Sequence, residues 1–548
     1  MPDAKYDAVV IGGGHHGTII ACYLAKAGMK VAVFEKHPEL GGGAISEEAP
    51  APGFRQNSCA HFTRFYTHPA YQEFNLREEG LQYIFPDQNE GMIFHDGTSY
   101  IGYSAYRVVD PQTGRQEYSE ENVKKTYEQI RRFSQRDADV YLDLLDKYTR
   151  YWKSAFHRQR FSAPTAWGVP DPIEELIANP DSGLEPVHQF MTVRQIGYDY
   201  FASSELRTLF MRATPTSNGL FADDVLGLQG LVHCMALVLS FEPASIAVGG
   251  TASITKALVS AGKKMGVEYF TGQEVDRILI ENGVAKGVQL SNGAQVNADL
   301  VISDLGVPQT VTRLMRDLSV SGKILHRINN INYDRAQIFW GNVAVHELPK
   351  YNADVDNPGV GIQPRLYWGP KDPDYYATKY QHEIYVLGFS QQFFMLTAPD
   401  SIWDRTRAPE GKHTILIEDY AAPARLFSPR EWNRLREEFV DAALEQWQKL
   451  APNMTRDNVI ASRIYTPYDV QMSHPDMYEG SWSVGAMMGY QMGRFRPIPE
   501  LANYTTPAQN LYICSSNLHS AGGIGRGSSY NCYQTIAKEK GLPTFKKS

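Results

Sequence analysis

Cysteine is scarce in this sequence of 548 residues. The five cysteines are Cys22, Cys59, Cys234, Cys514 and Cys532, and no two of them form a C-x-x-C motif. This spacing excludes a redox dithiol pair of that type, and the odd number argues for a reducing compartment. An excess of basic residues is also missing: the net charge is −8 at pH 7, so we expect no nucleic-acid partner.

Long hydrophobic runs are missing too. The longest, residues 225–241, contains Gln229 and His233 and is marginal for a membrane span, which needs about 20 apolar residues. We expect a buried helix; such a helix could also line an access path for an apolar substrate, so peripheral membrane contact stays open as an alternative. A first strand near Tyr6 leaves no room for a signal peptide, and we expect a cytoplasmic protein.

The signatures of several enzyme classes are absent. The sequence contains no G-x-S-x-G, no H-E-x-x-H, no G-x-x-x-x-G-K-[ST] and no cysteine and histidine spacing typical of a metal site. Hydrolase, zinc-enzyme and P-loop functions are therefore poor explanations of this chain, and we predict no metal site.

Glycine, in contrast, is concentrated near the N-terminus. Apolar residues 8–11 are followed by Gly12-Gly13-Gly14-His15-His16-Gly17 and then by residues 18–27, in which apolar side chains have helical spacing. This pattern predicts a strand, a tight turn and a helix. Gly12, Gly14 and Gly17 occupy the G-x-G-x-x-G positions, where the backbone approaches a pyrophosphate at the helix N-terminus.

The residues after this helix favour one cofactor. A second apolar run, residues 31–34, ends at Glu35, about 20 residues beyond the glycines. A carboxylate there can accept hydrogen bonds from ribose hydroxyls, and it favours FAD or NAD over NADP, whose extra phosphate it would repel. Gly41 and Gly42 let the backbone approach the phosphates a second time, which resembles FAD-binding proteins of the glutathione-reductase superfamily. We therefore expect FAD.

The dinucleotide-binding pattern resumes in the middle of the chain. Residues 242–270 predict a loop, a helix from about Ser253 and a strand, and Asn282-Gly283 and Asn292-Gly293 then separate alternating runs as hairpin turns. A closing strand is expected at residues 300–303. We predict an α/β protein with a discontinuous Rossmann-type FAD-binding domain (residues 1–55, 245–308 and 495–548) and an inserted α+β substrate domain (residues 56–244 and 309–494).

The inserted part is expected to contain both helices and strands. Residues 118–152 have helical spacing and a charged surface, which predicts a helical excursion. Aromatic-rich residues 335–345 and 381–390 predict strands. Residues 428–451 predict a helix with Ser428 as its N-cap.

A second stretch of small residues lies near the C-terminus. Residues 511–515 predict a strand, residues 520–529 a glycine-rich loop, and residues from Tyr530 onward a helix. The backbone can again approach a ligand here, and a second helix N-terminus can point at it. In flavoproteins this placement stabilises negative charge at the N1–C2 carbonyl end of the reduced ring.

Five segments, taken in order, point to one family. They are VVIGGGHHGTIIACYLAKAG, VFEKHPELGGGA, APGFR, VGGTASITKAL and FRPIPELANYTTPAQNLYICSSNLHSAGGIGRG. The chain resembles the phytoene-desaturase-like flavin oxidoreductases, which include bacterial carotenoid desaturases and the pyridine nucleotide-disulfide oxidoreductase domain 2 proteins. The resemblance spans essentially the whole chain, and it implies the fold and FAD more specifically than the substrate.

The resemblance also implies a set of cofactor contacts. Residues that would hold the adenosine diphosphate half are Gly12, Gly14, Gly17, Glu35, Lys36, Gly41 and Gly42, with the backbone of Val275 near the adenine. Ser516, Gly523 and Ile524 would lie along the ribityl chain and the flavin. His15 and His16, inside the first glycine turn, complete the predicted cofactor site.

Departures from the family's pattern bear on the substrate. Ser515 stands where many relatives have glycine, and Arg526 and Ser528 replace small residues or proline beside the flavin loop. Gln56-Asn57 stand where carotenoid desaturases have an aromatic-aspartate pair. A polar, charged lining of this kind argues against a long polyene substrate.

A flavin accepts a hydride, which carries two electrons, from an activated carbon, while the protein positions the substrate and accepts a proton. Candidate proton acceptors or substrate-orienting groups are His61, His519, Arg526 and Tyr490. For each of them, a hydrogen-bonded structural role is the alternative.

We expect an FAD-dependent dehydrogenase or desaturase of a hydrophobic small molecule, with isoprenoid or alkenyl compounds as a candidate class and dioxygen or a quinone as electron acceptor. The residues leave other functions open: an FAD-dependent C–N or C–O oxidase, a flavin isomerase without net redox change, or a non-catalytic flavin-bearing interaction protein. A homo-oligomer also stays open.

Overall fold

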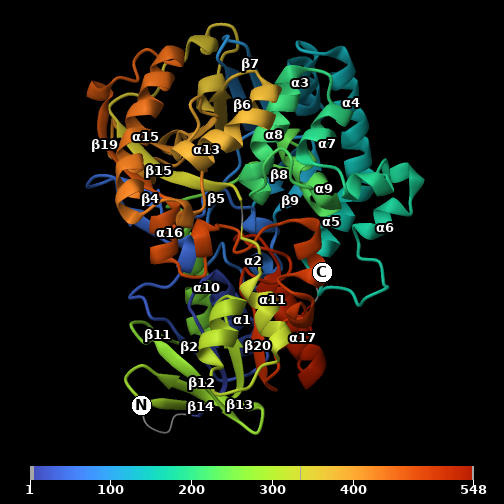
Figure 1. The fold of residues 1–548 in the computed structure, drawn as a ribbon, viewed down its shortest axis with the longest axis vertical. Helices are drawn as coiled ribbons and strands as arrows, with labels where there is room; N and C mark the ends of the chain where they lie inside the picture. The colour runs from blue at the N-terminus through green and yellow to red at the C-terminus, as the bar shows by residue number, and fades with distance from the viewer. Residues whose placement is uncertain (1–4, 334, 546–548) are drawn as a thin grey trace.

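The computed structural model describes residues 5–333 and 335–545. Two seven-stranded sheets organise the chain, and in Figure 1 the first lies in the lower half of the molecule and the second in the upper half. Each sheet is assembled from segments that are distant in the sequence.

The first sheet is of the Rossmann type. Its strand order is β11-β2-β1-β14-β13-β12, and β20 pairs with β14. β1 pairs in parallel with both β2 and β14, and β12 and β13 form an antiparallel hairpin. The strands are β1 (Lys5–Ile11), β2 (Val31–Phe34), β11 (Glu268–Phe270), β12 (Val275–Glu281), β13 (Val284–Leu290), β14 (Gln295–Ser303) and β20 (Leu511–Ile513). The predicted discontinuous Rossmann-type domain is confirmed.

Three helices accompany this sheet: α1 (His15–Lys26), α10 (Ala252–Lys264) and α17 (Ser528–Lys540). α1 contacts both α10 and α17, and all of its residues from 16 to 24 are buried. A helix that is covered on several sides needs apolar or small residues around most of its circumference, and the sequence of α1 has this composition.

The second sheet is mainly antiparallel. Its order is β19-β15-β18-β17-β16-β6-β7, and only the pair of β16 and β6 is parallel. The strands are β6 (Gln88–Phe94), β7 (Ser99–Tyr103), β15 (Gln337–Val345), β16 (Arg365–Gly369), β17 (Met395–Ala398), β18 (His413–Ala421) and β19 (Val459–Tyr465). The strand predicted at residues 335–345 is confirmed as β15.

Helix α15 (Pro429–Leu450) covers this sheet. It begins where expected, because the Ser428 hydroxyl accepts a hydrogen bond from the amide of Glu431. On its buried face, the ring of Phe439 stacks on Phe339 of β15 at 4.5 Å between centroids. Helices packed on a mostly antiparallel sheet confirm the inserted α+β part.

The strand predicted at residues 381–390 is wrong. The structure has helix α13 (Gln381–Leu387), which ends at Gly388 with a φ of +98°. Glycine commonly ends helices in this conformation. Ile384 is buried, whereas Val386 and Leu387 are 57% and 45% exposed. The aromatic content suggested a strand, and the glycine was the better signal.

A helical excursion extends from the second sheet, as predicted. Its longer helices are α3 (Glu120–Arg131), α4 (Gln135–Lys147), α5 (Lys153–Arg160), α7 (Val193–Tyr200), α8 (Ser204–Asn218) and α9 (Gly227–Val238). α9 corresponds to the expected buried helix, because nearly all of its residues are buried. Within residues 5–333 and 335–545, no helix combines the length and apolar character that a membrane crossing requires.

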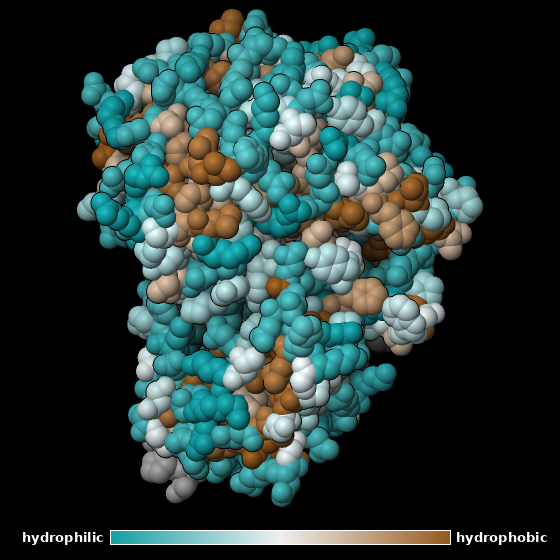
Figure 2. All heavy atoms as spheres, viewed as in Figure 1, coloured by the Kyte–Doolittle hydropathy of each residue, from teal (hydrophilic) through white to brown (hydrophobic). Residues whose placement is uncertain are grey.

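Short elements complete the fold: β3 (Ser46–Glu48), β4 (Arg55–Asn57), α2 (Pro69–Glu73), β5 (Tyr83–Ile84), β8 (Tyr106–Asp110), β9 (Arg115–Tyr118), α6 (Glu174–Ile177), β10 (Ile246–Ala247), α11 (Gly322–Asn329), α12 (Pro373–Tyr375), α14 (Asp400–Trp403) and α16 (Pro467–Ser473). Figure 2 shows a mainly hydrophilic face on which hydrophobic side chains form separate small patches. Peripheral membrane contact stays a prediction.

Two hydrophobic cores correspond to the two sheets. The core around the first sheet also includes Phe65, Tyr71 and Leu314, which the predicted boundaries assign to the substrate domain. The boundaries themselves therefore stay a prediction.

Candidate functional site

A cavity of about 530 Å³ is lined by residues that both sheets position. Gly12 and Glu35, which follow strands of the first sheet, line one end, and Trp340 and Glu418 of the second sheet line the other wall. The volume is in the range of small-molecule sites.

The turn between β1 and α1 forms one end of this cavity. Gly12 has a φ of +94°, a conformation that favours glycine. A Cβ atom on Gly17 would lie 2.2 Å from the carbonyl oxygen of Gly12, so the helix can pack this closely only without a side chain there. The predicted glycine turn is thus present, and Gly12 and Gly14 line the cavity.

Glu35 is held above this turn. Its Oε2 accepts a hydrogen bond from the amide of Gly13 at 2.7 Å, and its Oε1 accepts one from the amide of His37 at 2.8 Å. Both oxygens are therefore oriented by the backbone. Glu35 and the neighbouring Lys36 line the cavity. This is the place where a ribose carboxylate is expected in a Rossmann-type site.

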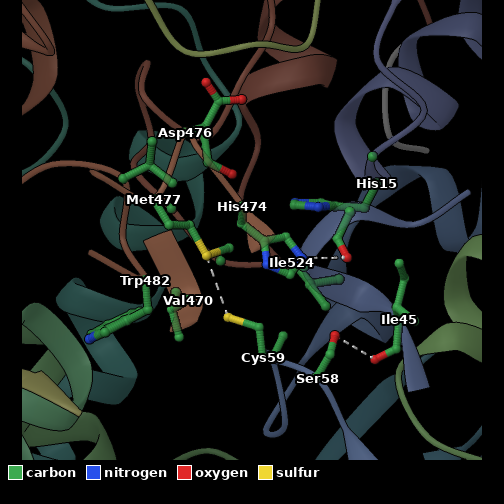
Figure 3. A pocket seen from close by; sticks show the side chains of 18 of the residues that line it. His15, Ile45, Ser58, Cys59, Val470, His474, Asp476, Met477, Trp482 and Ile524 are labelled. Carbon is green, nitrogen blue, oxygen red and sulfur yellow. Dashed lines mark hydrogen bonds between the residues drawn. The ribbon is translucent and has the colours of Figure 1, made fainter. Parts of the chain in front are cut away.

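The second glycine pair packs directly on the first turn. The amide of Gly41 donates to the carbonyl of Gly13 at 2.8 Å, and a Cβ on Gly42 would lie 3.3 Å from the Cα of Gly14. Gly42 lines the cavity. Its carbonyl oxygen lies 3.3 Å from Nε2 of His474, a contact drawn as a dashed line in Figure 3.

The two histidines of the turn have different surroundings. His15 lines the cavity, and its Nε2 is buried without a hydrogen-bond partner among the described residues. Burial lowers the pKa of His15 to about 4, so the ring is neutral. His16 instead packs inward, with Nδ1 3.1 Å from Oγ of Ser529, and does not line the cavity.

The C-terminal loop forms the adjoining wall. Ser516, Gly523 and Ile524 line the cavity, and their contact with a ribityl chain and flavin stays a prediction. Val275, at the start of β12, is buried and does not line it. The bare glycine turn, the oriented carboxylate of Glu35 and the buried, partnerless Nε2 of His15 fit the adenosine diphosphate half of FAD.

Asp304 also lines the cavity next to the glycine turn, and it was not among the residues predicted from the sequence. It follows β14, and its Oδ2 accepts a hydrogen bond from the amide of Gly17 at 2.9 Å. Burial raises the pKa of Asp304 well above its ordinary value. The serine-aspartate pair at the end of the predicted closing strand was a signal for it, because strand ends in such sheets face the ligand.

The middle of the cavity is shown in Figure 3. Sγ of Cys59 lies 3.7 Å from Sδ of Met477, and Oγ of Ser58 donates to the carbonyl of Ile45 at 3.0 Å. Asp476 accepts a hydrogen bond from the amide of Gly306 at 2.9 Å. The contact of Cys59 with Met477 joins the segment around residues 470–477 to the N-terminal segment, and Asp476 joins it to the loop after β14.

Of the predicted catalytic candidates, His61 and Arg526 line the cavity. Nε2 of His61 lies 2.8 Å from Oδ1 of Asp400. Arg526 is 9% exposed. Its pKa is lowered to about 9, mainly by burial and to a smaller extent by the positive charges of Arg160, Arg496 and Arg64.

The other two candidates lie outside the cavity wall. His519 is buried, and its Nε2 lies 2.7 Å from the carbonyl oxygen of Gln159, which holds the loop against α5. Tyr490 is 60% exposed and accepts a hydrogen bond from Asn332 at 2.8 Å. Neither side chain lines the cavity, although His519 lies near enough to Arg526 for that positive charge to help lower the pKa of His519.

Most of the far wall was not predicted. It consists of aromatic and aliphatic side chains together with buried charges; these are Phe62, Leu237, Ile338, Trp340, Trp482, Arg64, Arg160, Arg365, His233 and Glu418. These residues come from helices α5 and α9, strands β15, β16 and β18, and two loops that are far apart in the sequence, so no local motif connects them. Only the proximity of Phe62 and Arg64 to His61 in the sequence gave a signal.

Comparison with known proteins places the chain among oxidoreductases. Residues 10–74 match the model of the NAD(P)-binding Rossmann-like domain. The chain is 24% identical to a limonene dehydrogenase chain of Castellaniella defragrans, covering 98% of this chain and 95% of that protein. It is 24% identical to pyridine nucleotide-disulfide oxidoreductase domain-containing protein 2 of Rattus norvegicus (98% and 94% covered) and to phytoene desaturase of Fusarium fujikuroi (96% and 87%).

Solved structures share the fold. An oxidoreductase from Methanosarcina mazei matches with a TM-score of 0.59 at 19% identity, covering 98% of this chain and 100% of that chain. Cyclohexylamine oxidase from Brevibacterium oxydans matches with a TM-score of 0.56 at 15% identity, covering 98% and 100%. The names of the sequence relatives agree with the predicted FAD-dependent oxidoreductase class. Over nearly its whole length, the chain is a homologue of limonene dehydrogenase, pyridine nucleotide-disulfide oxidoreductase domain-containing protein 2 and phytoene desaturase, which confirms the resemblance found in its sequence.

Proposed function

We propose that this protein is an FAD-dependent oxidoreductase that dehydrogenates an apolar small molecule. One observation carries the proposal: a single cavity connects the dinucleotide-binding turn at Gly12 and Glu35 with an aromatic wall at Trp340 and Trp482. A cofactor held at the turn and a substrate held at the wall would therefore meet in one enclosed space.

The names of two relatives support an apolar substrate with carbon–carbon double bonds. One is named for limonene and another for phytoene. The lining of the second-sheet side agrees with this class, because Phe62, Leu237 and Ile338 offer apolar surface next to Trp340. Such side chains exclude water and bind hydrocarbon surface.

The chemistry divides between cofactor and chain. FAD, when bound, supplies an acceptor for a hydride and its two electrons. The substrate loses one hydrogen as that hydride and a second as a proton, and a double bond forms between the two carbons. We assign the proton to Glu418, the carboxylate that β18 contributes to the cavity wall, which is only 3% exposed. Dioxygen or a quinone would then take the electrons.

Oxidation of an amine is less compatible with this wall. Cyclohexylamine oxidase shares the fold at low identity, which says nothing of the substrate. The cavity is lined by Arg64, Arg160 and Arg526. Three guanidinium groups would repel an ammonium ion, so the electrostatics favour carbon–carbon dehydrogenation.

The test is anaerobic mixing of the purified yellow protein with terpenoid, alkenyl, amine and alcohol compounds, followed by flavin absorbance and product analysis. We expect bleaching together with a desaturated product from an alkenyl compound. A rearranged product without bleaching would indicate the isomerase alternative, and protein without bound flavin would refute the proposal.

Glu418→Gln tests the proton acceptor. We expect flavin content to be unchanged and flavin reduction to slow by about 100-fold, a typical effect of losing a general base. The matched control is Glu445→Gln on the exposed side of α15, which should reduce at the wild-type rate. A Glu418→Gln variant that reduces as fast as the wild type would remove this residue from the mechanism.

A further inference from the structure

One end of the cavity carries more positive charge than the nearby carboxylates neutralise. Four arginines line it: Arg64, Arg160, Arg365 and Arg526. Buried charges are normally paired, because an isolated charge loses its hydration without compensation. The partners of each guanidinium therefore indicate whether the pocket is complete.

Arg365 is accounted for within the protein. Its Nη1 lies 2.9 Å from Oε1 of Glu90, and its Nη2 donates to the hydroxyl of Tyr367 at 2.7 Å. The guanidinium also lies 4.7 Å from the ring centroid of Phe62. Within the described part of the chain its Nε has no hydrogen-bond partner, but its charge is paired with Glu90, so Arg365 needs no further anion.

The other three arginines lack an anionic partner. Nε of Arg64 donates to the carbonyl of Pro243 at 3.1 Å, and Nη1 of Arg160 lies 3.4 Å from the hydroxyl of Thr67. Nε of Arg160 is buried without a hydrogen-bond partner. Within residues 5–333 and 335–545, none of Arg64, Arg160 and Arg526 forms an ion pair, and the Arg526 side chain has no hydrogen bond.

The carboxylates that act on these arginines are already engaged. Glu90, which pairs with Arg365, also acts on Arg64 over a longer distance. Glu242 interacts with Arg160 and Arg64 over a longer distance, but it accepts hydrogen bonds from the hydroxyl of Tyr148 and from Gln116 and lies 3.7 Å from Nζ of Lys153. Lys153 adds another positive charge to the group. The cluster therefore keeps an excess of positive charge.

The remaining polar group at this end adds no negative charge. His233 lines the cavity with its ring stacked on Phe156 at 5.5 Å between centroids. Burial, and then the nearby arginines, lowers the pKa of His233 well below its ordinary value, so the ring is neutral. A neutral imidazole can still hydrogen-bond a ligand.

We propose that Arg64, Arg160 and Arg526, here called the arginine pocket, bind the anionic end of an amphipathic substrate, a carboxylate or a phosphate joined to an apolar body. Guanidinium groups recognise both anions through paired N–H donors. The apolar body would lie on Phe62, Leu237 and Trp340, which line the same cavity. This assignment rests on the proposed function and gives its apolar substrate a charged end.

The test is calorimetric titration of the flavin-containing protein with three matched probes: octanoate, octyl phosphate and octanamide. We expect at least one of the two anions to bind 10-fold or more tightly than the amide, and the two anions distinguish a carboxylate from a phosphate. Equal binding of all three would overturn the proposal. Because calorimetry needs no turnover, a protein that prefers the anions but never reduces its flavin would refute the proposed function and keep the pocket.

Variants locate the binding. Arg526→Gln and Arg160→Gln should each remove the preference for the anion, whereas Arg526→Lys should keep part of it because a point charge remains. Arg158→Gln is the matched control on α5, since Arg158 is 54% exposed and pairs with Glu175 at the surface. It should bind like the wild type.

A second measurement distinguishes binding of a substrate anion from an alternative role of these arginines. In that role they would stabilise negative charge on the reduced cofactor. The flavin midpoint potential is measured for the wild type, Arg526→Gln and Arg158→Gln. An altered potential in Arg526→Gln with a retained preference for the anion would overturn the proposal. Loss of the anion preference with an unchanged potential would support it.

Discussion

Nε2 of His61 lies 2.8 Å from Oδ1 of Asp400, and both side chains are almost completely buried. Asp400 also pairs with Arg407, with Nη2 3.1 Å from Oδ2, and Nδ1 of His61 lies 3.1 Å from Nδ2 of Asn57. Both ring nitrogens of His61 thus have protein partners. The imidazole is held as part of the cavity wall with a partner on each nitrogen, which favours another residue as the proton acceptor.

Asp400→Asn is expected to destabilise the protein. Removing the carboxylate leaves the buried guanidinium of Arg407 without its anion, and breaking a buried pair in this way typically costs about 3–5 kcal/mol. Denaturant unfolding at pH 7 measures the effect. The control is Glu438→Gln, because Glu438 pairs with Arg434 on the exposed side of α15. That change should cost less than about 1 kcal/mol, and equal costs for the two variants would contradict the prediction.

Gly17→Ala is expected to abolish retention of the flavin. The added Cβ would lie 2.2 Å from the carbonyl oxygen of Gly12, so the turn or the start of α1 must shift. Flavin content after gel filtration measures the loss. Gly322→Ala is the matched control, since an added Cβ there contacts nothing within 4 Å. If Gly17→Ala keeps its flavin, the turn does not hold the phosphates.

Asp476→Asn should change the dependence of stability on pH. Burial raises the pKa of Asp476 to about 6, although the Gly306 amide and the nearby Lys36 and Arg313 oppose the shift. A raised pKa in the folded state favours the protonated acid, so its stabilising effect is present below about pH 4 and is lost as the pH rises to about 6. The asparagine variant stays neutral throughout.

The melting temperature of Asp476→Asn should therefore exceed that of the wild type at pH 8 and equal it at pH 4. Thermal unfolding across this range measures the difference. Asp441→Asn, which removes an exposed carboxylate that pairs with Arg456, is the control and should show no such trend. A constant difference between Asp476→Asn and the wild type at all pH values would refute the argument.

Electron transfer out of the flavin should not involve a protein disulfide. Cys514 and Cys532 are buried and free, and burial raises the pKa of each thiol well above its ordinary value. Thiolates, the reactive form, are therefore scarce. A Cys514→Ala, Cys532→Ala double variant should turn over at the wild-type rate with dioxygen or a quinone. Normal flavin content with a large loss of turnover would contradict this.

The order of strands and helices at both ends of the chain could be predicted because their signals are local. The turn at Gly12, the acid at Glu35 and the hairpin at Asn282-Gly283 each depend on backbone conformations that a few neighbouring residues impose. The failure at residues 381–390 has a local cause as well. Aromatic residues suit both strands and buried helices, and only Gly388 marked a helix end.

By itself, then, the sequence determined the Rossmann-type turn and the cofactor class, because glycine spacing and one carboxylate specify that backbone within a short segment. Only the tertiary structure decided which charged groups meet in the cavity. Arg64, Arg160 and Arg526 come from distant segments, and His519 lies close to Arg526 in the sequence yet faces away from the cavity wall. Side-chain burial and charge pairing depend on distance in space, which sequence spacing does not encode.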